Sequence, residues 1–87
     1  MRVSVFDTYV TRTDGRLMHF DILVRDDEMD LEKVYGFGEK FLAEKGQTGQ
    51  VITTKECRFC HIEEASPEIG RSINERGFHI IEMENCL

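Results

Sequence analysis

The sequence predicts a small α+β domain with the element order β-β-α-β-α-β. Three observations lead to this prediction: an Asp-Gly step between two β-rich runs, an amphipathic helical repeat in the middle of the chain, and a Ser-Pro helix start ahead of a last apolar run. The chain has 87 residues. A chain of this length builds one modest core, so residues 1–87 are expected to form a single domain.

An N-terminal hairpin is the first predicted unit. The Asp-Gly step at residues 14–15 is typical of a tight turn. A three-residue turn with a left-handed glycine sets Tyr9 opposite His19 and Asp7 opposite Asp21, which gives one polar and one apolar face. A two-residue turn would move Asp7 onto the apolar face, so we prefer the first register. The apolar face then carries Phe6, Val10, Met18, Phe20 and Ile22.

Two helices follow from spacing and capping. Residues 31–45 carry apolar side chains at helical intervals, and Gly38 lies on this stripe, where it would allow a close approach to the sheet. Ser66 and Pro67 are typical of an N-cap and a first helical position. Gly77 is expected to end this second, shorter helix.

The remaining strands are expected at residues 50–56 and 78–84. Each predicted helix links two successive strands, and helical crossovers usually join parallel strands. We therefore expect a mixed four-stranded sheet with both helices packed on its apolar face.

Charge and hydropathy limit the classes of partner. The chain carries 17 acidic and 11 basic residues, a net charge of -6, which argues against nucleic acid and against anionic membrane surfaces. No stretch approaches the ~18 apolar residues of a membrane span. The N-terminus lacks the apolar segment of a signal peptide, so we expect a cytoplasmic protein with reduced cysteines.

The most distinctive segment is the Cys-x-x-Cys-His motif that ends at His61. The two-residue spacer between Cys57 and Cys60 lets both thiolates face one tetrahedral zinc ion, with His61 as a third ligand. His79 and Cys86 are candidates for the fourth position, on the condition that the last strand pairs beside the third.

Other interpretations of the motif stay open. Cys57 and Cys60 are also placed as a redox dithiol between a strand and a helix, although the helix begins several residues later than in such proteins. Covalent haem attachment uses the same motif but requires export. The interpretation that needs no ligand, and that we prefer, treats both cysteines as small half-buried residues with His61 in solvent.

A second constellation lies on the polar face of the hairpin. Asp7, Tyr9, His19 and Asp21 share this face in the preferred register. Two facing carboxylates repel each other unless a proton, cation or ligand lies between them. The group is a candidate acid–base or metal site, although a half-solvated antiparallel sheet carries polar residues of this kind without any ligand.

Four segments together resemble a known family. Residues 5–10, 18–22, 57–63 and 77–83 resemble a small bacterial family known as domain of unknown function family twenty-twenty-four. The resemblance covers nearly the whole chain and implies a compact α+β domain in a prokaryotic cytoplasm. It implies no activity and no catalytic or binding residue.

These observations favour a non-enzymatic domain that binds a protein partner or a second copy of itself, with zinc as the candidate metal of the Cys-x-x-Cys-His segment. The alternative is a thiol-dependent redox protein that uses Cys57 and Cys60.

Overall fold

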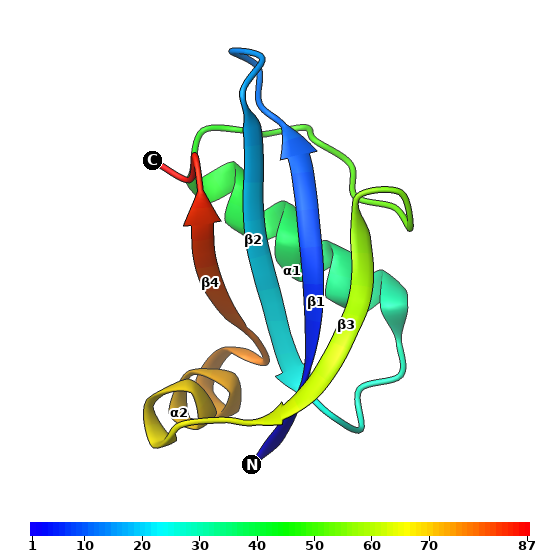
Figure 1. Cartoon of the computed structure of the whole chain (residues 1–87), viewed down its shortest axis with the longest axis vertical. Helices are drawn as coiled ribbons and strands as arrows, with labels where there is room; N and C mark the ends of the chain where they lie inside the picture. Colours follow the sequence, from blue (N-terminus) through cyan, green and yellow to red (C-terminus); the bar gives the residue numbers. More distant parts are fainter.

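The computed structural model describes residues 1–87 and has the predicted order of elements (Figure 1). The six elements are β1 (Arg2–Thr11), β2 (Leu17–Arg25), α1 (Leu31–Glu44), β3 (Cys57–Glu64), α2 (Pro67–Arg76) and β4 (His79–Glu84). The chain is therefore an α+β domain of the β-β-α-β-α-β type, as its sequence predicts.

The four strands form one sheet in the order β3-β1-β2-β4. Every neighbouring pair is antiparallel, so the expectation of a mixed sheet was wrong. The crossover through α1 does return the chain in the direction of β2, because β2 and β3 are both antiparallel to β1. However, β1 lies between them, so the two parallel strands are not neighbours (Figure 1).

The register of the N-terminal hairpin is the predicted one. Tyr9 lies opposite His19, and Asp7 lies opposite Asp21. Gly15 has φ +88°, and its backbone N–H donates to the carbonyl of Arg12 at 2.9 Å. A glycine is favoured here because residues with a side chain rarely adopt this left-handed backbone conformation. The turn thus sets which hairpin residues share a face.

Helix α1 packs on the apolar face of the hairpin. Asp30 caps it by accepting from the backbone N–H of Lys33 at 3.3 Å. A Cβ at Gly38 would lie 2.5 Å from Ile52 Cδ1 and 2.8 Å from Ile22 Cδ1, so the glycine permits the close approach. The main core between α1 and the sheet includes Phe6, Val10, Met18, Phe20, Ile22, Val34, Phe41, Leu42 and Phe78.

Helix α2 lies on the opposite face, which corrects the expectation that both helices share one face. Ile73 of α2 packs with Val3, Val5 and Leu23 in a separate small cluster. These strand residues alternate with those of the main core, so their side chains point away from α1. They are apolar positions on an otherwise polar face, near the end of the sheet where β1 begins (Figure 1).

The third strand begins later than the sequence predicts. Residues 50–56 form a loop, and β3 begins only at Cys57. Ile52 is buried in the main core, which accounts for the apolar residue within the loop. Thr53 and Glu56 then close a capped turn, in which the backbone N–H and hydroxyl of Thr53 donate to Glu56 Oε1 at 2.7 and 2.8 Å. The Cys-x-x-Cys-His motif consequently lies within a strand, not after one.

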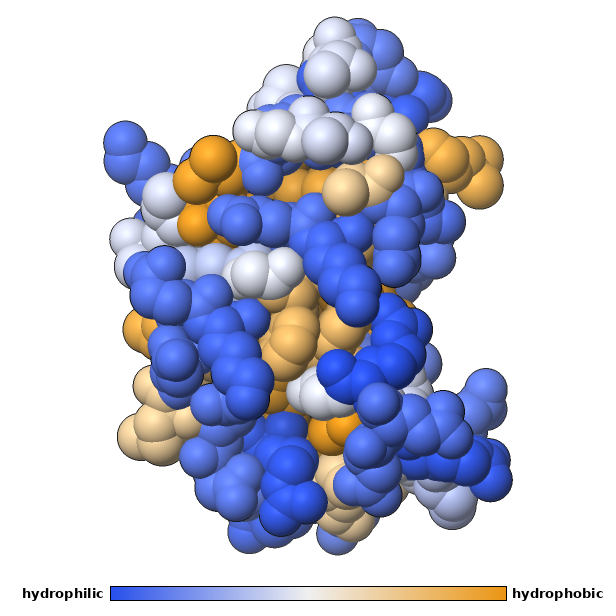
Figure 2. Space-filling view, turned by 180° about the vertical axis from the view of Figure 1, so that it is seen from behind, coloured by the Kyte–Doolittle hydropathy of each residue, from blue (hydrophilic) through white to orange (hydrophobic).

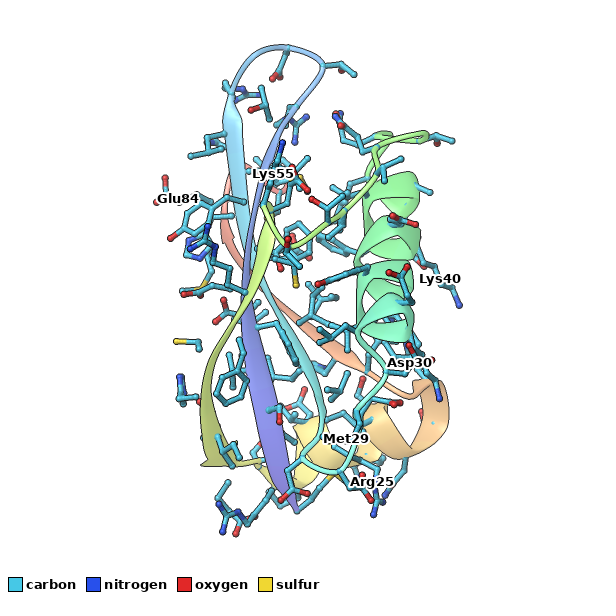
Figure 3. The ribbon with its side chains drawn as sticks, turned by 90° about the vertical axis from the view of Figure 1, so that its right-hand side faces the viewer. Arg25, Met29, Asp30, Lys40, Lys55 and Glu84 are labelled. Atoms are coloured by element: carbon cyan, nitrogen blue, oxygen red, sulfur yellow. The ribbon has the colours of Figure 1, made fainter.

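The outer surface of α1 is largely hydrophilic (Figure 2). Lys40 points outward from this helix, whereas Glu84 lies on the other side of the sheet (Figure 3). Neither helix has the length and apolar character needed to cross a membrane. One sheet face is thus covered by α1, and the other is covered only at one end by α2.

Candidate functional site

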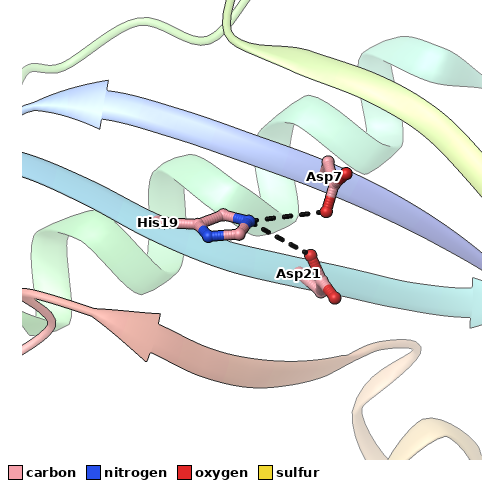
Figure 4. A group of neighbouring side chains, drawn as sticks. All are labelled: Asp7, His19 and Asp21. Carbon is pink, nitrogen blue, oxygen red and sulfur yellow. Dashed lines mark hydrogen bonds and ion pairs between the residues drawn. The ribbon is translucent and has the colours of Figure 1, made fainter.

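The sheet face that α1 does not cover carries the candidate site. Asp7 of β1 and His19 and Asp21 of β2 converge there, and we call them the Asp–His–Asp cluster (Figure 4). His19 Nε2 lies 3.4 Å from Asp7 Oδ1 and 3.8 Å from Asp21 Oδ1. The cross-strand pairing of the hairpin produces this arrangement directly, since Asp7 and Asp21 are opposite each other.

Tyr9 completes the predicted constellation by stacking on His19. The two ring centroids are 4.1 Å apart and the planes differ by 10°. This contact covers one side of the imidazole, and the His19 side chain is only 14% exposed. The stacking restricts the ring, so that Nε2 stays directed at the two carboxylates.

The two carboxylates titrate differently because their surroundings differ. Burial, followed by the neighbouring Asp7, raises the pKa of Asp21 from 3.8 to about 6. The hydrogen bond from Asp21 is the largest cause that lowers the pKa of Asp7. When Asp21 is ionised, its buried Oδ1 has no hydrogen-bond donor. One proton is therefore shared unequally, with Asp21 as the carboxyl that retains it.

The Asp–His–Asp cluster has the donors of a metal site. One nitrogen of His19 and one oxygen from each aspartate all lie within 4.8 Å of one another. Zinc takes imidazole nitrogen and carboxylate oxygen at 2.0–2.2 Å, so a small inward movement of these side chains would bring them to ligand distance.

Strand β3 brings two of the three named residues of the Cys-x-x-Cys-His motif, Cys60 and His61, to the same face. The register between β1 and β3 shifts between Val5 and Phe6: Val5 pairs with His61 and Phe6 with Phe59, so Cys60 is the extra residue of a β-bulge. Cys60 Sγ lies 3.1 Å from His61 Nδ1. His61 Nε2 in turn lies 2.7 Å from Glu63 Oε1.

Cys60 also lies beside the Asp–His–Asp cluster. Partial desolvation by neighbouring atoms raises the pKa of the exposed Cys60 thiol, and Asp7 raises it further through charge and a hydrogen bond. The charge of His61, from the same strand as Cys60, also lowers the pKa of Asp21. Cys60 and Asp7 line one groove of about 520 Å³, together with Tyr9, Lys55, Glu56, Arg58 and Phe59.

Cys57 is not part of this group. It lies opposite Thr8, on the α1 side of the sheet, and is buried in the main core. Burial is the main cause that raises the pKa of its thiol. Cys57 and Cys60 therefore lie on opposite faces of β3, and the structure does not form the thiol pair that the redox and Cys-x-x-Cys-His zinc interpretations require.

The two further zinc candidates are distant from Cys60 in the sheet. His79 begins β4, at the opposite edge of the sheet from β3. Cys86 is buried in the main core, where its Sγ donates to the carbonyl of His19 at 3.3 Å. The condition for their participation, a last strand beside the third, is not met.

Sequence reasoning identified Asp7, Tyr9, His19 and Asp21 as one group but did not connect Cys60 to them. The connection depends on which residue of β3 faces which residue of β1. A bulge within β3 breaks the simple alternation from which faces are predicted.

Comparisons with known proteins agree with this fold. The family described as "Domain of unknown function (DUF2024)" matches residues 1–83. The solved NMR structure of protein NE1680 from Nitrosomonas europaea, a structural genomics target, is 40% identical, with all of both chains covered and a TM-score of 0.85. A comparison with curated proteins gave no match. Because the family model spans almost the entire sequence, the chain belongs to the DUF2024 family.

Proposed function

We propose that the protein is a small non-enzymatic binding domain that takes a zinc-like divalent cation at the Asp–His–Asp cluster. The observation that carries the proposal is Asp21 Oδ1, which in the ionised side chain is buried without a hydrogen-bond donor and faces His19 Nε2 at 3.8 Å. Buried carboxylate oxygens in proteins are normally hydrogen-bonded or bound to a metal.

Electrostatics favours a cation at this position. Two facing carboxylates on a half-buried surface are stable when a proton or a cation lies between them. The proton binds with a pKa of about 6 at Asp21, so much of it is lost at neutral pH. A divalent cation can then replace it, and the net charge of -6 increases the local concentration of cations.

The donor set favours zinc over magnesium and calcium. Mg²⁺ and Ca²⁺ prefer ligand shells made of oxygen, whereas His19 offers a nitrogen. The thiol of Cys60 next to Asp7 adds a soft donor at the edge of the Asp–His–Asp cluster. Zn²⁺ accepts all three donor types.

The test is calorimetric titration of metal-free protein with Zn²⁺, and with Mg²⁺ in parallel. We expect Zn²⁺ binding that releases protons near pH 6, and no heat from Mg²⁺. Asp21→Asn and His19→Ala should each abolish or strongly weaken binding. Asp27→Asn serves as the control because Asp27 is an exposed acid, paired with Arg25 at 3.3 Å, away from the cluster.

Two results would contradict the proposal. The first is an absence of Zn²⁺ binding by the wild-type protein. The second is binding that survives both substitutions in the Asp–His–Asp cluster, because the ion would then be held elsewhere. Loss of binding in the Cys60→Ser variant as well would assign the thiol to the same site.

A further inference from the structure

Strand β3 has an unpaired edge that is open to a partner. It is the outermost strand next to β1, and Figure 1 shows it along one side of the sheet. Of its eight residues, only Cys57 is buried. Phe59 and Ile62 are 56% and 42% exposed. A long edge strand with exposed apolar side chains is a ready template for pairing with another strand.

We propose that two copies of this chain associate through β3, with the two strands antiparallel and related by a two-fold axis between Cys60 and His61. In this register Arg58 lies opposite Glu63 of the second copy. Phe59 lies opposite Ile62 of the second copy. The sheets of the two copies would then join into one continuous sheet.

The charges of β3 favour a second copy of the same strand as the partner, and they favour antiparallel pairing. The strand carries a positive charge near its start, at Arg58, and negative charges at its end, at Glu63 and Glu64. Antiparallel pairing of two such strands brings opposite charges together at both ends of the contact. Parallel pairing would place like charges side by side, which is unfavourable.

The bulge at Cys60 makes this pairing consistent with the faces of the sheet. Phe59 pairs with Phe6 and Ile62 pairs with Ser4, so both lie on the α1 side although they are three residues apart. In a regular strand, residues three apart point to opposite faces. The extra residue Cys60 returns Phe59 and Ile62 to the same face, so each of these apolar side chains meets the other one of the second copy.

The charged pair matches in the same way on the other face. Arg58 pairs with Asp7, and Glu63 pairs with Val3, which places both on the polar face. The pairing therefore satisfies both faces at once. On the α1 side, the second copy would also cover part of a groove that is lined in part by Met29, Leu31 and Phe59, all of which are exposed.

The experiment is sedimentation equilibrium of the full chain over a wide concentration range, in the presence of a chelator. The chelator separates this proposal from the metal site, because association through β3 needs no ion. We expect a reversible monomer–dimer equilibrium. Arg58→Glu or Glu63→Arg should each weaken association by roughly tenfold or more, because each creates two repulsive pairs by symmetry.

Exchange of the two charges tests the register itself. The double variant Arg58→Glu with Glu63→Arg should recover association, since opposite charges face each other again. The control is the same exchange on α2, Arg71→Glu with Glu75→Arg, because both residues are exposed and this helix contacts β4 and β2. This control should associate like the wild type, and circular dichroism should show that all variants remain folded.

Three results would overturn the proposal. A chain that stays monomeric at every concentration has no such interface. A dimer that is insensitive to both single substitutions uses another surface. A double variant that fails to recover association, while remaining folded, excludes the register. Retained Zn²⁺ binding in a monomeric protein would leave the proposed metal site standing.

Discussion

Replacing Asp21 by asparagine is the substitution that most directly probes the Asp–His–Asp cluster. Asn has nearly the same shape as Asp but carries neither a charge nor a titrating proton. In the metal-free protein it removes the repulsion with Asp7 and the burial of a charge whose Oδ1 has no hydrogen-bond partner. We therefore expect Asp21→Asn to stabilise the metal-free fold at neutral pH.

The magnitude follows from linkage. The pKa of Asp21 rises from 3.8 to about 6 on folding, and each pKa unit corresponds to 1.36 kcal/mol, so the largest effect is about 3 kcal/mol. The side chain is 14% exposed and the two carboxylates share their proton, which reduces this figure. We expect about 1–2 kcal/mol at neutral pH, or a rise in Tm of about 5–10 °C for a domain of this size.

The sign of the pH dependence is set by the raised pKa. The folded state holds its proton more tightly than the unfolded state, so the wild type loses stability as pH rises from about 4 to about 6. Above pH 6 the loss is complete, and below pH 4 both states are protonated. The advantage of the Asn variant should therefore grow between pH 4 and 6 and vanish at lower pH.

The assay is urea unfolding of both proteins across this pH range with a chelator present. Asp27→Asn is the control, because this acid is exposed and its loss should change stability little. In Zn²⁺ at a hundredfold excess over its Kd, the wild type should gain about 2.7 kcal/mol and the variant nothing. An Asn variant that is less stable than the wild type at neutral pH would refute the reasoning, since the carboxylate would then be stabilised by bonds of its own.

Three further predictions concern the core, the thiols and a helix cap. Gly38→Ala should destabilise the fold by about 1–3 kcal/mol in urea unfolding, because the added Cβ would overlap core side chains. Gly36→Ala in the same helix meets no atom within 4 Å and should stabilise the fold by up to about 1 kcal/mol. Equal effects of the two substitutions would show that the core side chains move aside at Gly38. In native thiol titration Cys60 should react and buried Cys57 should react only on unfolding, so simultaneous reaction would place both thiols at the surface. Ser66→Ala should lower the stability by about 1 kcal/mol, because the serine side chain accepts from the N–H of Ile69 at 3.3 Å; an unchanged urea midpoint would mean that water replaces this cap.

Local chemistry was sufficient to predict the hairpin and the helix ends. A turn with Gly15 in the left-handed conformation allows one register, and that register places Asp7 opposite Asp21 and Tyr9 opposite His19. The Ser-Pro start and glycine stop of α2 act on neighbouring backbone groups. Each of these signals concerns residues close in sequence, so no knowledge of the rest of the fold was needed.

Strand order and the position of β3 depended on contacts between distant parts of the chain. A helical connection determines the direction of the next strand but not which strand it joins, and β1 took the place between β2 and β3. The sequence predicts that Ile52 belongs to a strand, because an apolar residue buried from a loop and one buried from a strand give the same local pattern. Only the packing under α1 distinguishes them.

The candidate site also has one part that local sequence determines and one part that depends on distant contacts. The sequence by itself determined the Asp–His–Asp cluster and the stacking of Tyr9, since all four residues belong to one hairpin whose register its turn dictates. Only the tertiary structure decided on which face of the sheet each residue of the Cys-x-x-Cys-His motif lies. A bulge opposite the Val5–Phe6 step turns Cys60 toward the Asp–His–Asp cluster and leaves Cys57 in the core. Facing direction in a strand changes with every inserted residue, and that insertion is set by the neighbouring strand.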